Sequence, residues 1–156
     1  MDDGTTIERE IEIAASAATV FEVITSPEHL KEWWPDEAEL DARPGAIGRL
    51  VFGDPTSPEA HIPEVTVVDA VADRLFSFRW VYSDGETAAE DNSLLVTFEL
   101  TPLGPTSTRL RMTETGWHEK TWDAEVREQE YRDHVSGWDH FIPRLGAYAP
   151  TVEAAA

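Results

Sequence analysis

Isoleucine and charged residues alternate along Ile7–Ile13, so that Ile7, Ile11 and Ile13 share one face and three glutamates occupy the other. A period of two with one apolar face is typical of a half-buried β-strand. Arg9 falls on the isoleucine face of this strand. A buried arginine needs an acidic partner, which the sequence must supply elsewhere.

Two short helices are predicted after this strand. Ser16 can cap a helix over Ala17–Thr25 that buries Val20, Phe21 and Ile24. Ser26-Pro27 restarts the chain, and a second helix is predicted over Glu28–Trp34, ended by Pro35. That helix closes on the adjacent pair Trp33-Trp34. Successive helical side chains point about 100° apart, so we expect one indole in the core and the other at a cavity entrance.

Short strands joined by tight turns fill the middle of the chain. Turn residues such as Arg43-Pro44-Gly45 and Pro102-Leu103-Gly104-Pro105 separate them, and hairpin connections predict an antiparallel sheet. The strands are expected at Glu37–Ala42, Gly48–Gly53, Ile62–Val71, Arg74–Tyr82, Ser93–Leu100 and Thr108–Trp117.

The pattern then changes to a helical period from Trp122 to Tyr148, with an apolar stripe formed by Tyr131, Val135, Trp138, Ile142 and Leu145. Gly137 lies off the stripe and weakens a helix by roughly 1 kcal/mol relative to alanine. Pro143 is expected to kink or end the helix near Asp139–Ile142. Neither residue has an explanation in the sequence. This helix is the long element available to cover the apolar face of the sheet.

Composition narrows the classes of function. The chain has 156 residues, a net charge of −19 and no cysteine. One domain over residues 6–148 is expected, with loose ends at 1–5 and 150–156. The acidic net charge argues against nucleic-acid partners. The apolar runs are too short for membrane insertion. The cytoplasm is the simplest compartment. No cofactor motif and no metal-binding H-E-x-x-H pattern occurs, and the i,i+4 pair Glu130–His134 is interpreted as a solvated ion pair.

The order of these motifs resembles a known family over about residues 6–148. The chain is similar to the START-like, or SRPBCC, superfamily, and within it to the activator of heat-shock protein ATPase homologue-like family. The residues that carry the resemblance are Ala15–Phe21, Thr25–Leu30, Lys31-Glu32-Trp33-Trp34-Pro35, Arg43-Pro44-Gly45 with Gly48, Leu75–Trp80, Gly116 and Gly137-Trp138.

The resemblance implies an α+β helix-grip fold, in which a curved antiparallel sheet of about seven strands wraps around the C-terminal helix. It also implies a cavity between sheet and helix, where many relatives bind small hydrophobic molecules. The expected lining residues are mostly aromatic. The candidates for ligand binding are Trp33, Trp34, Phe52, Phe78, Trp80, Phe98, Met112, Glu114, Tyr131, Val135 and Trp138.

Glu114 is the sharpest polar candidate. Alternation along Leu110–Glu114 places its carboxylate on the interior face with Leu110 and Met112. Such a group suits a ligand acceptor or a general base. Two other interpretations stay open: a frayed strand end that exposes Glu114, or a buried structural pair with Arg9.

Three classes of function follow. The first is non-covalent binding of a small, largely hydrophobic molecule. The second is a cyclase- or aromatase-like enzyme that uses Glu114 or Tyr131 for proton transfer. The third, suggested by the family resemblance, is chaperone regulation or another protein-interaction role, which predicts an exposed apolar patch. A homodimer through an edge strand is a further alternative.

Overall fold

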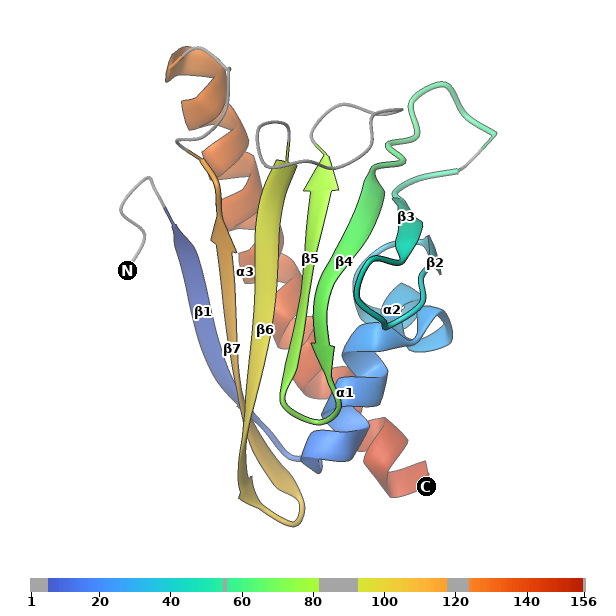
Figure 1. Cartoon of the computed structure of the whole chain (residues 1–156), viewed down its shortest axis with the longest axis vertical. Coiled ribbons are helices and arrows are strands. Elements are labelled where there is room, and N and C mark those ends of the chain that lie inside the picture. The colour runs from blue at the N-terminus through green and yellow to red at the C-terminus, as the bar shows by residue number, and fades with distance from the viewer. Residues whose placement is uncertain (1–5, 55, 82–92, 118–123, 156) are drawn as a thin grey trace.

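An antiparallel sheet with the strand order β1-β7-β6-β5-β4-β3-β2 forms the body of the molecule (Figure 1). The structure is a computed structural model that describes residues 6–54, 56–81, 93–117 and 124–155. The strands are β1 (Ile7–Ile13), β2 (Glu37–Glu39), β3 (Ile47–Val51), β4 (Glu64–Val71), β5 (Leu75–Val81), β6 (Ser93–Gly104) and β7 (Ser107–Thr115).

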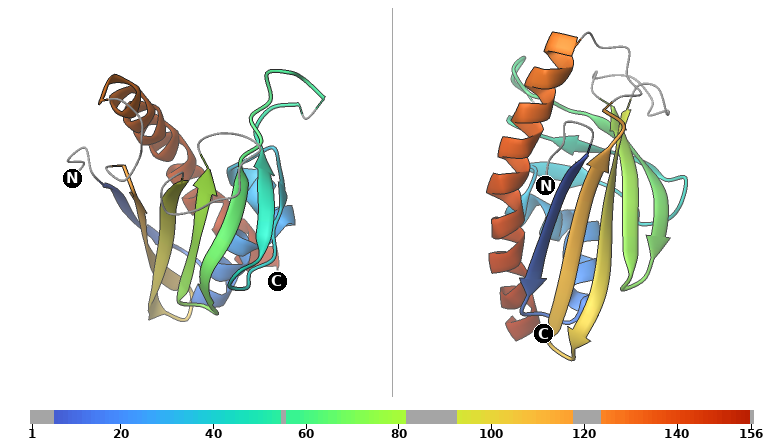
Figure 2. Two further views of the ribbon diagram at one scale, coloured as in Figure 1. Left: turned by 45° about the horizontal axis from the view of Figure 1, so that its top comes forward. Right: turned by 90° about the vertical axis from the view of Figure 1, so that its left-hand side faces the viewer.

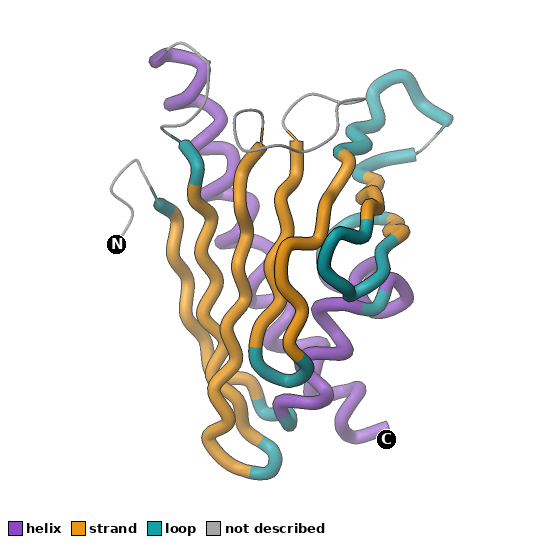
Figure 3. The backbone as a smooth tube through the Cα atoms, in the orientation of Figure 1, coloured by secondary structure: helices purple, strands orange, loops and turns teal. Residues whose placement is uncertain are grey.

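Helix α3 (Ala124–Ala155) runs along one face of the curved sheet, as the two turned views in Figure 2 show. The short helices α1 (Ala17–Thr25) and α2 (Pro27–Trp33) follow β1 and fill one end of the same face (Figure 3). The helix-grip arrangement predicted from the sequence is therefore confirmed, with seven strands among the described residues.

The core lies between the sheet and α3. Along β7 every second side chain is buried, namely Thr108, Leu110, Met112 and Glu114. Ile7 of β1 and Val96 of β6 pair with Glu114 in the ladders on either side of β7. The strand therefore keeps its register through Glu114 and does not fray there, which fixes the carboxylate on the interior face.

The C-terminal helix is longer than the sequence predicts. It passes through both Pro143 and Pro150 and continues to Ala155, so residues 150–155 are helical and do not form a loose end. Pro143 has no backbone N–H, so the carbonyl of Asp139 has no helical donor. Both residues are exposed, and water can donate to that carbonyl instead. The expected helix start at Trp122 and the expected N-terminal tail, residues 1–5, lie outside the described residues.

A carboxylate near the end of α3 holds the beginning of α1. The Glu153 side chain accepts hydrogen bonds from the backbone N–H of Ser16 (3.0 Å) and from the hydroxyls of Ser16 and Thr19. Ser16 caps α1 as predicted, because its hydroxyl accepts from the Thr19 N–H (3.2 Å). Tertiary contacts of this kind outweigh the local helix-breaking effect of the two prolines.

Strand β6 also runs further than predicted. It continues to Gly104 and pairs there with Ser107, with an irregularity in register between Pro102 and Gly104. The turn expected at 102–105 is therefore shifted toward Ser107. No helix among the described residues is long and apolar enough to cross a membrane.

Candidate functional site

A pocket of about 170 Å³ lies between the sheet and the middle of α3. Aromatic side chains dominate its walls, and a few polar groups join them. The lining residues are Trp34, Phe52, His61, Trp80, Leu94, Asp133, His134, Gly137, Trp138 and Phe141.

Four of the residues proposed from the sequence meet in this pocket. Trp34 comes from the end of α2, Phe52 follows β3, Trp80 belongs to β5 and Trp138 to α3. Trp34 lies at the centre of the group, with its ring centroid 5.1 Å from that of Trp138, 5.3 Å from Trp80 and 6.1 Å from Phe52. Phe52 is held in place by an isolated bridge to His61, which brings His61 to the rim.

The tryptophan pair divides its roles as the sequence suggested, although both indoles are buried. Trp33 is fully buried and its Nε1–H donates to the Val23 carbonyl (3.1 Å), whereas Trp34 is 6% exposed and lines the pocket. The two rings stack with an interplanar angle of 21°, because Trp34 leaves the helical conformation at the C-cap (φ −126°, ψ −94°). A separation of 100° therefore does not apply to this pair.

Glu114 lies directly behind the pocket wall and is fully buried. Its Oε2 accepts from the Trp80 indole N–H (2.8 Å) and its Oε1 from the Trp138 indole N–H (3.0 Å). Oε1 also lies 2.8 Å from Nδ1 of His134. Burying a carboxylate without hydrogen-bond donors costs several kcal/mol of folding free energy. The two indoles and the imidazole supply the donors that this carboxylate needs.

His134 is the functional candidate that sequence reasoning missed. Its imidazole lines the pocket and packs edge-on against Trp80 and Trp117, with ring centroids 5.4 and 5.0 Å away. The expected neighbour Glu130 is present, but at 4.0 Å from Nε2 it is the more distant carboxylate. A signal did exist: His134 lies one helical turn before Trp138, so both share a face.

That face forms a second stripe on α3. His134, Gly137, Trp138 and Phe141 recur at helical spacing and all line the pocket. Hydrophobic periodicity does not reveal this stripe, because a histidine and a glycine interrupt it.

The remaining sequence candidates lie elsewhere. Trp33, Phe98 and Met112 are fully buried in the core. Phe78 borders a separate void of about 10 Å³. Tyr131 and Val135 border a surface depression on the other flank of α3. Each lies one position further along the helix than the stripe that lines the pocket, so each points to a neighbouring side of α3.

Two residues considered for polar roles have structural partners. The Tyr131 hydroxyl donates to the carbonyl of Thr6 (3.1 Å). Arg9 does not pair with Glu114: its Nε donates to Asp139 on α3 (2.7 Å). The register of β1 explains this difference, because Arg9 pairs with Met112 and Ile7 is the neighbour of Glu114.

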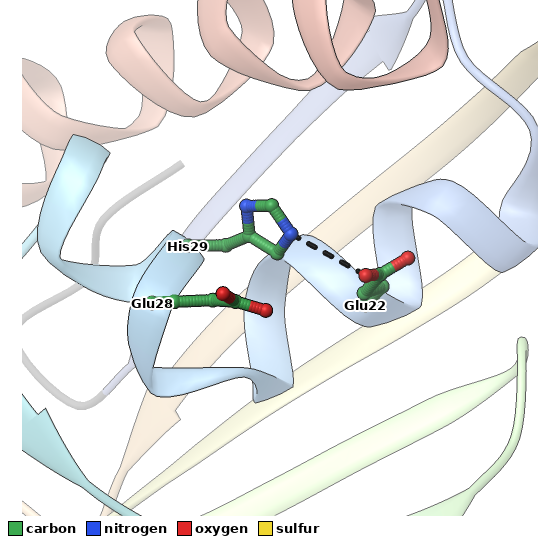
Figure 4. A group of neighbouring side chains, drawn as sticks. All are labelled: Glu22, Glu28 and His29. Carbon is green, nitrogen blue, oxygen red and sulfur yellow. Dashed lines mark hydrogen bonds and ion pairs between the residues drawn. The ribbon is translucent and has the colours of Figure 1, made fainter. Parts of the chain in front are cut away.

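A group of potential metal ligands lies on α1 and α2 (Figure 4), and none of its residues lines the pocket. One ligand atom from each of Glu22, Glu28 and His29 falls within 4.8 Å of the others, and both glutamates are exposed. The imidazole already has partners, the Tyr148 hydroxyl at 2.7 Å and Glu22 at 3.4 Å. Burial, together with the carboxylates of Glu32, Glu28 and Glu22, raises the pKa of the Tyr148 phenol. These contacts account for the group as a polar connection between α2 and α3.

Comparisons with known proteins agree with this fold. A family model described as Activator of Hsp90 ATPase homolog 1-like protein matches residues 14–149. A crystal structure of a Nitrosomonas europaea protein is 19% identical, with a TM-score of 0.74 and 99% of each chain covered. A Mesorhizobium loti protein is 20% identical with a TM-score of 0.73, covering 94% of this chain and 97% of that one.

A third solved structure is the Aha1 dimer from Colwellia psychrerythraea, which is 19% identical with a TM-score of 0.69 and covers 90% of this chain and 92% of that chain. At these identities the solved structures establish the fold alone. No curated protein matches the chain by sequence. Because the family model spans most of the sequence, the chain belongs to the family of Activator of Hsp90 ATPase homolog 1-like proteins.

Proposed function

We propose that the protein binds a small, largely apolar molecule in the pocket between the sheet and α3. The observation that carries this proposal is the pocket itself, a space of about 170 Å³ walled mainly by aromatic side chains together with His61, Asp133 and His134. Apolar walls with a few placed polar groups are the usual composition of a small-molecule site. An apolar cavity of roughly 150 Å³ accepts benzene, so this pocket suits one ring with small substituents.

Gly137 supports the proposal independently. A glycine inside a helix costs roughly 1 kcal/mol relative to alanine. Close packing does not require it here, because a Cβ built on Gly137 meets nothing within 4 Å. The residue lines the pocket, so its missing side chain leaves space where a ligand would lie.

The test compares ligand binding by the wild type with binding by Gly137→Leu, whose added side chain fills the pocket. Toluene and benzyl alcohol are titrated into ¹⁵N-labelled protein while the indole N–H signals are followed, since Trp80 and Trp138 donate to Glu114 beside the pocket. We expect saturable shifts of these two signals in the wild type. Gly137→Leu should abolish the shifts without loss of stability, because leucine is a better helix former than glycine.

Gly104→Leu is the matched control. Gly104 also has open space around a built Cβ, but it lies at the end of β6 and does not line the pocket. This variant should bind the probes as the wild type does. Unchanged binding in Gly137→Leu, or no saturable shift in the wild type, would contradict the proposed site.

Acid–base catalysis is a second candidate, favoured by the contact between Glu114 and His134. A buried carboxylate at Nδ1 orients an imidazole, and that imidazole lines an apolar pocket. In such a reaction His134 would take a proton from carbon next to a carbonyl and return one to the same carbon. Acetophenone in deuterated buffer tests this: deuterium should enter its methyl group faster with wild type than with His134→Ala. Equal rates in protein and buffer would exclude this reaction.

Chaperone regulation is the function named in the family description. It predicts an exposed apolar patch. The large exposed apolar side chains among the described residues, Ile47, Val68, Val71, Leu103 and Val126, are distributed over β3, β4, β6 and α3. Ile47, Val68 and Val71 lie on the neighbouring strands β3 and β4, so an external docking surface would be sought there.

Self-association is a proposal that rests on one relative, the Colwellia protein solved as a dimer. Strands β1 and β2 are the edges of the sheet in the part of the chain that the structure describes. An edge strand offers unpaired backbone groups to a second copy. Light scattering coupled to size exclusion would give the mass in solution.

A further inference from the structure

We infer that the molecule bound in this pocket is an organic cation, an ammonium group attached to an aromatic or other apolar body. The inference rests on the proposed function, because it specifies the ligand of the same pocket. Three observations carry it: the sign of the charges around the pocket, the aromatic character of its walls and the charge of the whole chain.

The charged lining residue among the described residues is acidic, and the guanidinium of Arg144 lies over the ring of Phe141 with its Cζ 5.9 Å from the centroid. Among the described lining residues Asp133 is the carboxylate, and none is lysine or arginine. Glu114 lies behind the wall and Glu130 lies 4.0 Å from Nε2 of His134. If His134 is protonated, its charge is offset by Glu114, and Asp133 still leaves the rim negative. His61 is the other imidazole in the lining, so the net charge of the site is most negative when both His61 and His134 are uncharged.

The walls suit a cation as well as an apolar body. Trp34, Phe52, Trp80, Trp138 and Phe141 all line the pocket. The negative faces of aromatic rings attract ammonium groups, and tryptophan is the strongest of the aromatic residues in this respect. The Trp80 and Trp138 indole N–H groups donate to Glu114, so neither is left to bind an anion.

The charge of the whole chain acts in the same direction. A net charge of −19 attracts cations to the protein and opposes carboxylates, phenolates and phosphates. An anionic ligand would therefore be repelled at long range and again by Asp133 at the rim. A neutral apolar ligand would gain nothing from either charge.

Three probes that share a benzyl group separate these classes of ligand. Benzyltrimethylammonium is the cation, neopentylbenzene is its uncharged isostere, and phenylacetate is an anion with the same ring. Each is titrated in the same buffer, with the Trp80 and Trp138 indole signals as the readout. We expect the cation to bind roughly three- to thirtyfold more tightly than the neutral isostere, and the anion to bind most weakly.

Asp133→Asn tests the contribution of the rim, because the substitution removes one charge and keeps the shape. It should weaken cation binding by about two- to fivefold and leave the neutral isostere unaffected. Glu125→Gln is the matched control, since Glu125 is an exposed acidic residue of α3 outside the pocket. It changes the net charge by the same amount and should have a smaller effect.

The outcomes distinguish this inference from the function on which it rests. Equal or tighter binding of neopentylbenzene or phenylacetate overturns the cation and leaves the binding pocket supported. A loss of cation affinity that is equal in Asp133→Asn and Glu125→Gln also overturns the role of the rim. Failure of all three probes to move the two indole signals overturns the proposed function and the inference together.

Discussion

Nδ1 of His134 on α3 lies 2.8 Å from Oε1 of Glu114 on β7, a contact between residues 20 positions apart in the sequence. The same carboxylate accepts the indole N–H groups of Trp80 on β5 and Trp138 on α3. One buried glutamate therefore joins two strands of the sheet to the helix that crosses it. This polar cluster fixes the side chains that form the back wall of the pocket.

Removing the carboxylate should destabilise the fold. Glu114→Ala leaves the indole donors of the partly buried Trp80 and the buried Trp138, and one imidazole, without their acceptor. We expect a loss of about 3 kcal/mol in the free energy of unfolding. Glu114→Gln should cost less, because its amide oxygen still accepts one bond. Urea denaturation measures both, with Glu99→Ala as the exposed control on β6. A Glu114→Ala protein as stable as wild type would refute the role of this cluster.

Filling the small space at Gly137 should stabilise the protein. Gly137→Ala adds a Cβ that meets nothing within 4 Å and raises helix propensity. We expect the free energy of unfolding to rise by about 1 kcal/mol. The change is measured by denaturation of the variant beside wild type. A decrease in stability would show that the backbone at this position needs glycine for a reason other than pocket space.

Gly48 should behave in the opposite way. A Cβ built there lies 2.1 Å from the carbonyl oxygen of Glu39 in the adjoining part of the sheet. Backbone atoms cannot yield as a flexible side chain can, so β2 and β3 must separate. We expect Gly48→Ala to lower the thermal midpoint clearly, while Gly104→Ala, which meets open space, should leave it nearly unchanged.

The anchor between Glu153 and α1 predicts a pH dependence of stability. Hydrogen bonds from Thr19 and Ser16 lower the pKa of the Glu153 carboxyl below its ordinary value of 4.5. A carboxyl whose folded pKa is depressed stabilises the fold above its unfolded pKa and loses that contribution as the pH falls through its folded pKa. Glu153→Gln should therefore lower the thermal midpoint at pH 7.

The difference between wild type and Glu153→Gln should shrink as the pH falls below the ordinary value of 4.5. Differential scanning calorimetry of both proteins from neutral to acidic pH measures it. Glu28→Gln, an exposed carboxylate on α2, serves as the control for general charge effects. A difference that stays constant through this range would exclude Glu153 as the titrating group.

The sequence predicts the elements well where the local pattern and the tertiary structure agree. Alternation in Ile7–Ile13 and in Leu110–Glu114 gave the correct faces, because each strand has one buried side. Prediction failed at the end of α3. Pro143 and Pro150 indicate a helix end locally, but the buried contacts of Ile142, Leu145 and Ala149 hold the helix together beyond them.

For the candidate site, the sequence predicts the aromatic walls of the pocket but not the histidine that lines it. Trp34, Phe52, Trp80 and Trp138 were among the proposed residues and line the pocket. The sequence pattern indicates His134 only as a solvated partner of Glu130 and does not explain Gly137. Both follow from the rotation of α3 about its axis, which decides which stripe faces the sheet. That rotation depends on packing and cannot be read from periodicity when two stripes compete.

The sequence by itself determined the alternating faces of the strands and the helical period of the C-terminal segment, and its family resemblance implied the helix-grip fold. The strand faces and the helical period depend on spacings of two and 3.6 residues, which are local properties. Only the tertiary structure decided that Glu114 meets His134 in place of Arg9, and that Trp34 is the indole at the pocket. Those choices depend on strand register and on the way α3 lies across the sheet, because contacts between distant segments are set by the packing of the whole domain.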